Sequence, residues 1–445
     1  MDIDVNASVS EKLFIQTRQL RILLYAVTPN ETSFPETHLV PDYVLQASPY
    51  FAVLLILEIF LAQVRGKPYH AINDGISSIS AGLISQTHSL LVRSIELVSY
   101  TYIFSNFCLV HLPWDSPWTW LLGFLGVDFG YYWAHRMGHE INLMWAAHQA
   151  HHSSEYYNLT TALRQSAVQR YGAWLFYLPM ALCVPPSTFY VHLQFNLLYQ
   201  FWIHTETIKS LGPLDYILNT PSDHRVHHGR NPYCIDKNYG GTLIIWDHLF
   251  GTFAHEEEPV VYGHVHPINT FDPILIQFQH HAHMFRMMRV TPGLSNKLAV
   301  IFKGPGWSPG LPRLGDPKDL PKVTGKEKPY NPVIPGWLTT YSIAHIVWTI
   351  MFYHSVEARI QMLPFSAGLI LVAFIVLTLW SVALLLDGRV STGWLEIWRC
   401  GLYLLGDWWL FVDSPVQILP SLSQAFFVAS ATFWMVHFVS SDTSA

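Results

Sequence analysis

Long apolar runs alternate with polar segments along this chain of 445 residues. Between residues 10 and 26, leucines are interspersed with charged residues, a pattern that predicts an amphipathic helix on a membrane surface. An apolar run from Tyr43 to Val64 is long enough to span a bilayer, a second extends from about Ile76 to Val110, and a third leads from Trp118 into His135. The hydrophobic pattern therefore predicts several membrane helices in the first third of the chain.

The later apolar segments extend this pattern to the C-terminus. A run from Ala173 to Ile203 contains three prolines and predicts two kinked or hairpin-forming helices. Four more segments, at 337–353, 365–386, 394–412 and 426–439, contain no cluster of ligand-type residues and predict membrane anchors. The fold class that we expect is an all-α, polytopic membrane helical bundle.

The region from Thr205 to Pro335 is polar and rich in proline, glycine and histidine. Its lysines and arginines indicate the cytosolic side of the membrane. Residues 240–253 predict a short, buried amphipathic segment, and residues 303–330 predict an irregular loop shaped by proline and glycine.

Composition narrows the function classes. The chain is 51% hydrophobic and only 13% charged, which is unusual for a soluble protein, and its net charge of -6 without a basic block argues against nucleic acid as a partner. The four cysteines show no CxxC spacing, and no dinucleotide, nucleoside triphosphate or serine-hydrolase motif is present. Any electrons for redox chemistry must therefore come from outside the chain.

Three histidine motifs, HRMGH, HQAHH and HRVHH, carry the candidate chemistry. Their spacing at i, i+3 and i+4 places the rings on one side of each helical turn. One first-row ion takes four to six ligands, so eight histidines suit two ions. The eight candidates are His135, His139, His148, His151, His152, His224, His227 and His228. The sequence predicts a two-metal site at the cytosolic end of the helices, forming a histidine-rich cap.

Other histidines are ranked by their place relative to the helices. His204 ends the run FWIH as His135 ends its own, which makes it a candidate ninth ligand, whereas we expect His192 to pack inside. The alternative for every histidine is a hydrogen-bonded core residue. Burying eight imidazoles together without a metal would leave many polar nitrogens to satisfy, which favours the metal site.

Ligand type and setting bear on the reaction. Nitrogen ligands accept zinc, iron, copper or nickel alike, but oxidation of an alkyl chain at a bilayer surface requires an oxidant, which iron with dioxygen supplies. Carboxylates near the motifs are candidates for orienting the rings or a cofactor: Glu140 and Asp128 first, then Glu155 and Asp223. Residues that bind an organic cofactor cannot be identified from the sequence.

The three motifs, in this order between membrane helices over about residues 121–253, resemble the fatty acid hydroxylase/sterol desaturase superfamily of di-iron membrane oxygenases. Within it, the segments around them (FLGVDFGYYWAHRMGHE, LQFNLLYQFWIHTE and NTPSDHRVHHGRN) resemble ether-lipid-cleaving monooxygenases, and this likeness covers nearly the whole chain. The resemblance implies that the eight motif histidines hold two iron ions.

The same resemblance implies the reaction and the partners. It implies an O2-using, tetrahydrobiopterin-dependent enzyme of the endoplasmic reticulum membrane that cleaves the O-alkyl bond of alkylglycerols and lyso-alkylglycerophospholipids. The products would be a fatty aldehyde and a glycerol derivative, and a separate enzyme would recycle the reduced pterin.

The expected organisation has five parts: an interfacial segment at 1–42, membrane helices at 43–117, a catalytic core at 118–255, a cytosolic loop region at 256–335 and C-terminal membrane helices at 336–445. Two other functions fit the same ligands. One is a lipid or sterol hydroxylase or desaturase of the same superfamily that takes electrons from a cytochrome. The other is a non-enzymatic membrane carrier of metal ions.

Overall fold

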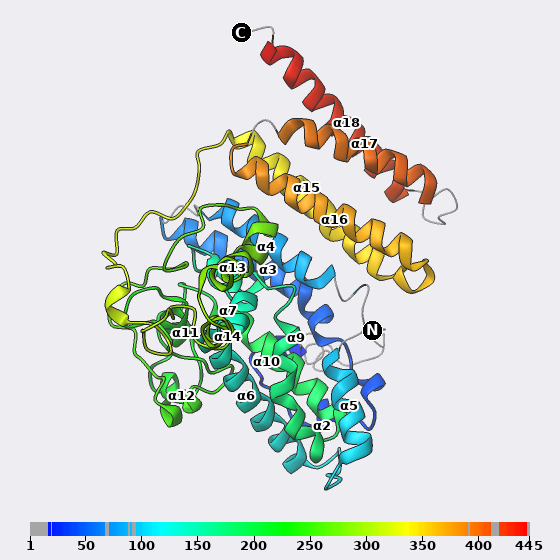
Figure 1. Cartoon of the computed structure of the whole chain (residues 1–445). Helices are drawn as coiled ribbons and strands as arrows, with labels where there is room; N and C mark the ends of the chain where they lie inside the picture. Colours follow the sequence, from blue (N-terminus) through cyan, green and yellow to red (C-terminus); the bar gives the residue numbers. More distant parts are fainter. Residues whose placement is uncertain are drawn as a thin grey trace. The chain divides into compact units, whose positions relative to one another are not determined.

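The computed structural model describes residues 17–18, 20–66, 71–87, 90, 95–389, 392–410 and 418–442 (Figure 1). Helices are the only regular elements in these ranges, accompanied by two isolated β-bridges, Leu218 with Leu243 and Gly229 with Tyr262. The predicted helical class is therefore confirmed for this part of the chain.

The chain divides into two compact units. The first comprises Met1–Ala71, Arg93–Ile268 and Gln277–Pro329, and the second comprises Ile72–Val92, Asn269–Ile276 and Tyr330–Ala445. All the histidines of the three motifs, and His204, belong to the first unit.

The first unit is built from helices of very different lengths. Its elements are α2 (Pro29–Thr32), η1 (Thr37–Leu39), α3 (Tyr43–Val64), α5 (Ile95–Phe107), α6 (Pro117–Glu140), α7 (Asn142–His148), η3 (His151–Ser153), α8 (Leu159–Leu163), α9 (Arg170–Ala173), η4 (Trp174–Leu182), α10 (Pro186–Ile203), η5 (Gly212–Tyr216), α11 (Pro221–His228), α12 (Ile245–Phe250), α14 (Leu294–Phe302) and η6 (Pro317–Asp319). The second unit contains α4 (Ile72–Thr87), α15 (Gly336–Glu357), η7 (Ile360–Met362), α16 (Phe365–Leu386), α17 (Gly393–Leu410) and α18 (Ile418–Asp442). Helix α13 (Pro273–Val290) begins in the second unit and continues into the first.

Most apolar runs form the helices that the pattern predicts. The runs from Tyr43 and from Trp118 become α3 and α6, and the proline-containing run becomes η4 and α10, with Pro186 at the first turn of α10 where it leaves no hydrogen bond unmade. The run at 76–110 supplies two helices, α4 and α5, one in each unit. Of the predicted interfacial helix at 10–26, residues 10–16 and 19 lie outside the described residues, and residues 17–18 and 20–23 are helical.

The polar region before the C-terminal helices is more regular than its composition indicates. Helices α13 and α14 lie in the stretch 205–335, whereas residues 303–330 form the expected irregular loop apart from the single turn η6. Histidine, glutamine and methionine make up much of α13, and they mask its helical periodicity because they are not strongly apolar.

Two segments among the described residues are long and apolar enough to cross a membrane, Thr37–Val64 and Phe365–Leu386. Little of the first is covered by protein, because Val53, Ile56 and Phe60 are all exposed on α3. Exposed apolar side chains of this size require an apolar environment. This pattern is typical of a helix that faces lipid.

Close packing of α6 brings its neighbours near the site. A Cβ atom at Gly123 would lie 2.6 Å from Thr188 of α10, and one at Gly130 would lie 2.8 Å from Tyr177 of η4. Small residues on one face of a helix let the partner backbones approach. Because they lack a side chain, these glycines allow α10 and η4 to pack closely against α6. Helix α6 carries the first histidine motif at its C-terminal end.

A buried ion pair lies in the second unit. Arg399 and Glu396 of α17 are fully buried and pair with each other, while the Glu396 carboxylate also accepts hydrogen bonds from Tyr341 of α15 and Ser381 of α16. A charge pair that is removed from water must be well hydrogen-bonded to persist. The network therefore ties three of the C-terminal helices together.

Candidate metal centre

Nine histidines reach the site from four places in the fold. The HRMGH histidines lie in the last two turns of α6, and those of HQAHH lie at the end of α7 and in η3. The HRVHH histidines lie on α11, and His204 is the C-terminal cap of α10. The structure therefore brings together all nine candidates that the sequence predicts as ligands.

The nine side chains form two groups, all of them buried. The first group is His135, His139, His148, His152 and His227, and the second is His151, His204, His224 and His228. Within each group, one ring nitrogen per residue lies within 4.8 Å of those of the others. Five and four nitrogens are enough for one ion in each group.

Distances between the inward nitrogens fit a coordination shell. His148 Nε2 lies 3.1 Å from His135 Nε2 and 3.1 Å from His152 Nε2 in the first group. His204 Nε2 lies 3.0 Å from His224 Nε2 and 3.2 Å from His228 Nε2 in the second. Ligands at about 2.1 Å from one ion are separated by about 3.0 Å in an octahedron and about 3.4 Å in a tetrahedron. The residues present therefore fit a metal ion.

Backbone carbonyls fix the orientation of four of these rings. The outward Nδ1 atoms donate to carbonyl oxygens in four pairs: His135 to Tyr239 (2.9 Å), His227 to Lys237 (2.9 Å), His151 to Arg164 (3.0 Å) and His204 to Gln200 (2.6 Å). A ring that donates through Nδ1 keeps the lone pair of Nε2 for a metal. His139 Nε2 is buried and has no hydrogen-bond partner among the described residues, which also suits a ligand atom.

Burial keeps these imidazoles neutral. Loss of water around the rings lowers the pKa of His148 and of His204 to about 4, and that of His227 to about 3. Neutral imidazole is the form that binds metal, so at pH 7 each of these rings is ready to coordinate without first losing a proton.

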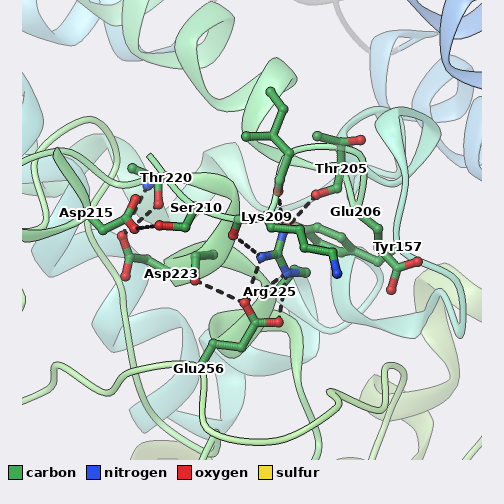
Figure 2. Close-up of polar contacts among 12 residues, drawn as sticks. Tyr157, Thr205, Glu206, Lys209, Ser210, Asp215, Thr220, Asp223, Arg225 and Glu256 are labelled. Atoms are coloured by element: carbon green, nitrogen blue, oxygen red, sulfur yellow. Dashed lines mark hydrogen bonds and ion pairs between the residues drawn. The ribbon is translucent and has the colours of Figure 1, made fainter. Parts of the chain in front are cut away.

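Arg225, inside the HRVHH motif, binds the segment that follows His204 (Figure 2). Its Nη1 atom donates to the carbonyl oxygens of Thr205 (3.1 Å) and Ile208 (2.8 Å), and Nη2 donates to that of Lys209 (2.5 Å). Glu256 pairs with Nη2 at 2.7 Å. The guanidinium therefore joins α11 to the end of α10, so that His204 and the α11 histidines keep their relative positions.

Two aspartates hold the segment between the last motif and α12. Asp128 accepts hydrogen bonds from the backbone of Thr242 (2.7 Å) and Leu243 (3.0 Å) and from the side chains of Asn196 and Trp246. Asp247 accepts from the backbone of Tyr239 and Gly240, and burial raises the pKa of Asp247 to about 6. Since the Tyr239 carbonyl accepts from His135, these contacts extend to one of the candidate ligands.

The remaining carboxylate candidates, Glu140, Asp223 and Glu155, belong to neither histidine group. Glu140 is buried and forms ion pairs with Arg136 (2.8 Å) and Arg313 (2.7 Å). Asp223 accepts from Thr220 at the start of α11, with its pKa raised to about 7 by burial, and Glu155 lies beside Gly263. These contacts favour structural roles.

The sequence did not single out Arg225, Asp247 or Tyr239, which the structure places around the histidines. An arginine or aspartate inside a polar motif carries no sequence signal for burial, and a backbone carbonyl carries none at all. His192 lies outside both groups and bonds through Nδ1 to the Tyr25 hydroxyl at 2.7 Å.

Comparison with known proteins agrees with this geometry. The fatty acid hydroxylase family model matches residues 120–252, which contain all nine histidines. A human alkylglycerol monooxygenase is 53% identical over 429 residues, which cover 95% of this chain and 96% of the human protein. The chain belongs to the alkylglycerol monooxygenase family.

Other members and distant relatives extend this comparison. The Xenopus tropicalis alkylglycerol monooxygenase is 53% identical over 93% of both chains, and the Caenorhabditis elegans one is 36% identical over 89% of this chain and 83% of its own. The family model for the alkylglycerol monooxygenase C-terminal domain matches residues 338–423. An ornithine lipid hydroxylase of Rhizobium tropici is 32% identical, but only over 33% of this chain and 45% of its own length. No solved structure matches the chain.

Proposed function

We propose that this protein is a di-iron monooxygenase that uses O2 and tetrahydrobiopterin to cleave the O-alkyl bond of alkylglycerol ether lipids. The observation that carries the proposal is the pair of buried histidine groups in a chain that aligns along 95% of its length with a human alkylglycerol monooxygenase. Alkylglycerols and lyso-alkylglycerophospholipids are the proposed substrates, within the lipid bilayer.

The proposed reaction balances with one O2 and two electrons. One oxygen atom enters the C–H bond next to the ether oxygen, and the other leaves as water with two electrons and two protons that the reduced pterin supplies. The resulting hemiacetal breaks its C–O bond to the glycerol oxygen, which takes the hydroxyl proton. The products are a fatty aldehyde and a glycerol derivative, and a separate enzyme would return the oxidised pterin to its reduced form.

Different residues of the chain would hold the iron ions and orient the histidine rings. The group of five histidines and the group of four would each hold one iron ion, and bound iron would supply the oxidising power for an unreactive C–H bond. The Nδ1 hydrogen bonds to backbone carbonyls orient the rings, and the apolar surroundings keep them neutral. The iron would thus be held by ring nitrogens that are already oriented and unprotonated.

Glu140 and Asp128 are proposed as positioning residues. The Glu140 carboxylate binds Arg136 of its own helix and Arg313 of the long loop, so it holds that loop next to the first histidine motif. Asp128 holds the segment whose Tyr239 carbonyl orients His135. Either residue would act on the reaction through the atoms that it holds.

The proposed location is the endoplasmic reticulum membrane, with several membrane helices and the metal centre facing the cytosol. Two segments that meet the length and hydropathy requirements support the membrane part. The lysine- and arginine-rich region after His204 supports the cytosolic side.

The test measures aldehyde release from an alkylglycerol by the purified protein, with and without tetrahydrobiopterin, together with its iron content. We expect about two iron ions per chain and turnover that requires the pterin. The variant His151→Ala should lose turnover, whereas His38→Ala, which changes an exposed histidine outside both groups, should keep it.

Two results would contradict the proposal. Full turnover by His151→Ala would reject the ligand assignment. Oxidation of sterols or fatty acyl chains with cytochrome-delivered electrons, without pterin-dependent release of aldehyde, would assign the protein to another reaction of the same superfamily.

A further inference from the structure

The stretch from Pro273 to Gly315 contains no acidic residue. It carries Arg286, Arg289, Lys297, Lys303 and Arg313, whereas 31 acidic residues in 445 would put about three in a stretch of this length. This segment has the charge that an anionic surface attracts.

Residues Phe278–Phe302, which we call the basic hairpin, consist of most of α13, a short turn and α14. Gly293, the N-cap of α14, has a φ of +80°, a conformation that favours glycine. Met284 of α13 and Val300 of α14 are buried together with Trp307. The two helices therefore pack against each other through their inner faces.

The outer face of the basic hairpin is apolar and exposed. On α13, Phe278 and Phe285 are two turns apart and 43% and 61% exposed. On α14, Leu294, Leu298 and Phe302 follow at intervals of four and are 75%, 47% and 59% exposed. Large apolar side chains on two neighbouring helices, flanked by exposed Arg286 and Arg289, match the pattern of amphipathic helices that lie in a membrane interface.

The inner face is attached to the helix that carries part of the metal site. Asn142, the first residue of α7, donates from its backbone N to the Lys303 carbonyl (2.7 Å) and from Nδ2 to the Val300 carbonyl (2.8 Å). Its Oδ1 atom accepts from His280 Nε2 at 2.7 Å. Helix α7 ends at His148, so these hydrogen bonds connect the hairpin to the helix of a proposed iron ligand, and Figure 1 draws α14 next to α7.

We propose that the basic hairpin is a membrane-binding element whose outer face inserts into the headgroup region of an anionic lipid bilayer. The five exposed apolar residues would enter the boundary between headgroups and acyl chains, while Arg286 and Arg289 would bind lipid phosphates. The charge of the segment and its absence of acidic residues favour this occupant over a protein partner or a second copy of the chain.

The hairpin would set the depth of the metal centre relative to the substrate, a step that rests on the proposed function. An amphipathic helix in this position lies about 5–10 Å into the headgroup boundary. The ether oxygen of an alkylglycerol lies at that same boundary, because it joins the glycerol to the alkyl chain. A hairpin fixed to α7 would therefore hold the histidines level with the bond that is cleaved, without withdrawing the lipid from the bilayer.

The experiment measures the depth of single labels on the full-length protein in nanodiscs that contain phosphatidylserine. Cys108 and Cys183 are first replaced by serine, since the other two cysteines are buried. An environment-sensitive fluorophore is then placed at Phe285→Cys or Leu294→Cys, with Lys322→Cys on the exposed loop as the control. We expect brominated lipids to quench the first two labels about twofold or more and to leave the control unquenched, while aqueous iodide does the reverse.

Each outcome bears on the proposal. Labels at 285 and 294 that iodide quenches as strongly as the control would overturn it. Shielding from iodide without quenching by brominated lipid would also overturn it and would assign the face to a protein partner or a second copy. The depth measurement needs no substrate and no iron, so its failure is distinguishable from failure of the proposed reaction.

A kinetic comparison tests the link to catalysis. The double variant Phe285→Ser, Leu294→Ser should raise KM for an alkylglycerol several-fold in bilayers but leave kcat and KM unchanged in detergent micelles, where no bilayer depth exists. Equal kinetics of variant and wild type in bilayers would reject the depth role. Loss of activity in both media would mean that the hairpin serves the fold alone, and would equally reject that role.

Discussion

Replacing Arg225 by lysine should loosen the metal centre although the charge is kept. The guanidinium donates hydrogen bonds to three backbone carbonyls and to the Glu256 carboxylate, and it does so from three different nitrogen atoms. A lysine ammonium presents its donors from one atom, so it reaches the carboxylate and one carbonyl at most. Two carbonyl oxygens of the segment that follows His204 would then lack this partner.

The size of the effect follows from those two carbonyls. Of the three carbonyls, that of Thr205 is buried, whereas those of Ile208 and Lys209 are partly open to water. A buried acceptor left unsatisfied costs about 1–3 kcal/mol, so the free energy of unfolding should fall by about 1–3 kcal/mol. Loss of the ion pair adds little, since Glu256 is partly exposed and the lysine can still reach it. His204 should become mobile relative to the histidines of α11, because Arg225 joins the two segments.

The assay compares iron content and thermal inactivation of the purified variants. Arg225→Lys should lower the midpoint of inactivation by about 1–3 °C and reduce the iron retained on dialysis. Arg230→Lys is the matched control, since among the described residues the Arg230 side chain donates one hydrogen bond, to the His264 carbonyl at 3.1 Å, which a lysine can replace. Wild-type iron content and midpoint in Arg225→Lys would refute the role of the guanidinium.

Two further predictions concern acid sensitivity and a tight turn. The metal-free protein should lose stability as the pH falls from about 6.5 to 4. In the folded protein the pKa of His148 is about 4 and that of His227 is about 3, both below the value of the unfolded chain. The folded state is therefore favoured by the neutral rings above pH 6.5, and this stabilisation disappears on acidification. His148 alone contributes on the order of 3 kcal/mol, and a melting temperature that is constant over this window would contradict the prediction. Gly240→Ala should reduce iron content, because its Cβ would lie 2.4 Å from the Leu243 carbonyl oxygen, whereas Gly172→Ala, with its nearest neighbour 3.9 Å away, should have no such effect. Equal iron content in the two alanine variants would reject this reasoning.

Much of the site could be predicted because helical spacing determines which side chains share a face. The i, i+3 and i+4 intervals of the three motifs predicted that the rings of each would point one way. The position of His204 at the end of an apolar run, like that of His135, predicted that it would join them, and the structure brings it within 3.3 Å of its neighbours.

The division into a group of five and a group of four could not be predicted in the same way. His151 and His152 are adjacent in sequence yet belong to different groups, and so do His227 and His228. Consecutive residues of a helix point about 100° apart, so they can reach different centres, but which one each reaches depends on where the other helices lie.

The fold shows a similar limit. Runs of leucine, valine and phenylalanine predict α3 and α16 because their composition alone identifies them, whereas the sequence of α13 predicts only part of a polar region. Its helical structure depends on tertiary contacts such as the burial of Met284 against Val300, and its sequence carries no strong periodicity of its own.

The hydrogen bonds between ring nitrogens and backbone carbonyls have an electrical consequence. A carbonyl orients an imidazole as a carboxylate does, but it brings no negative charge. Both groups consist of histidine, so the ligand set leaves the positive charge of two bound cations uncompensated. If the proposed iron ions bind here, this ligand set would favour their lower oxidation state and raise the reduction potential of the centre, so a mild two-electron donor would be sufficient to reduce it.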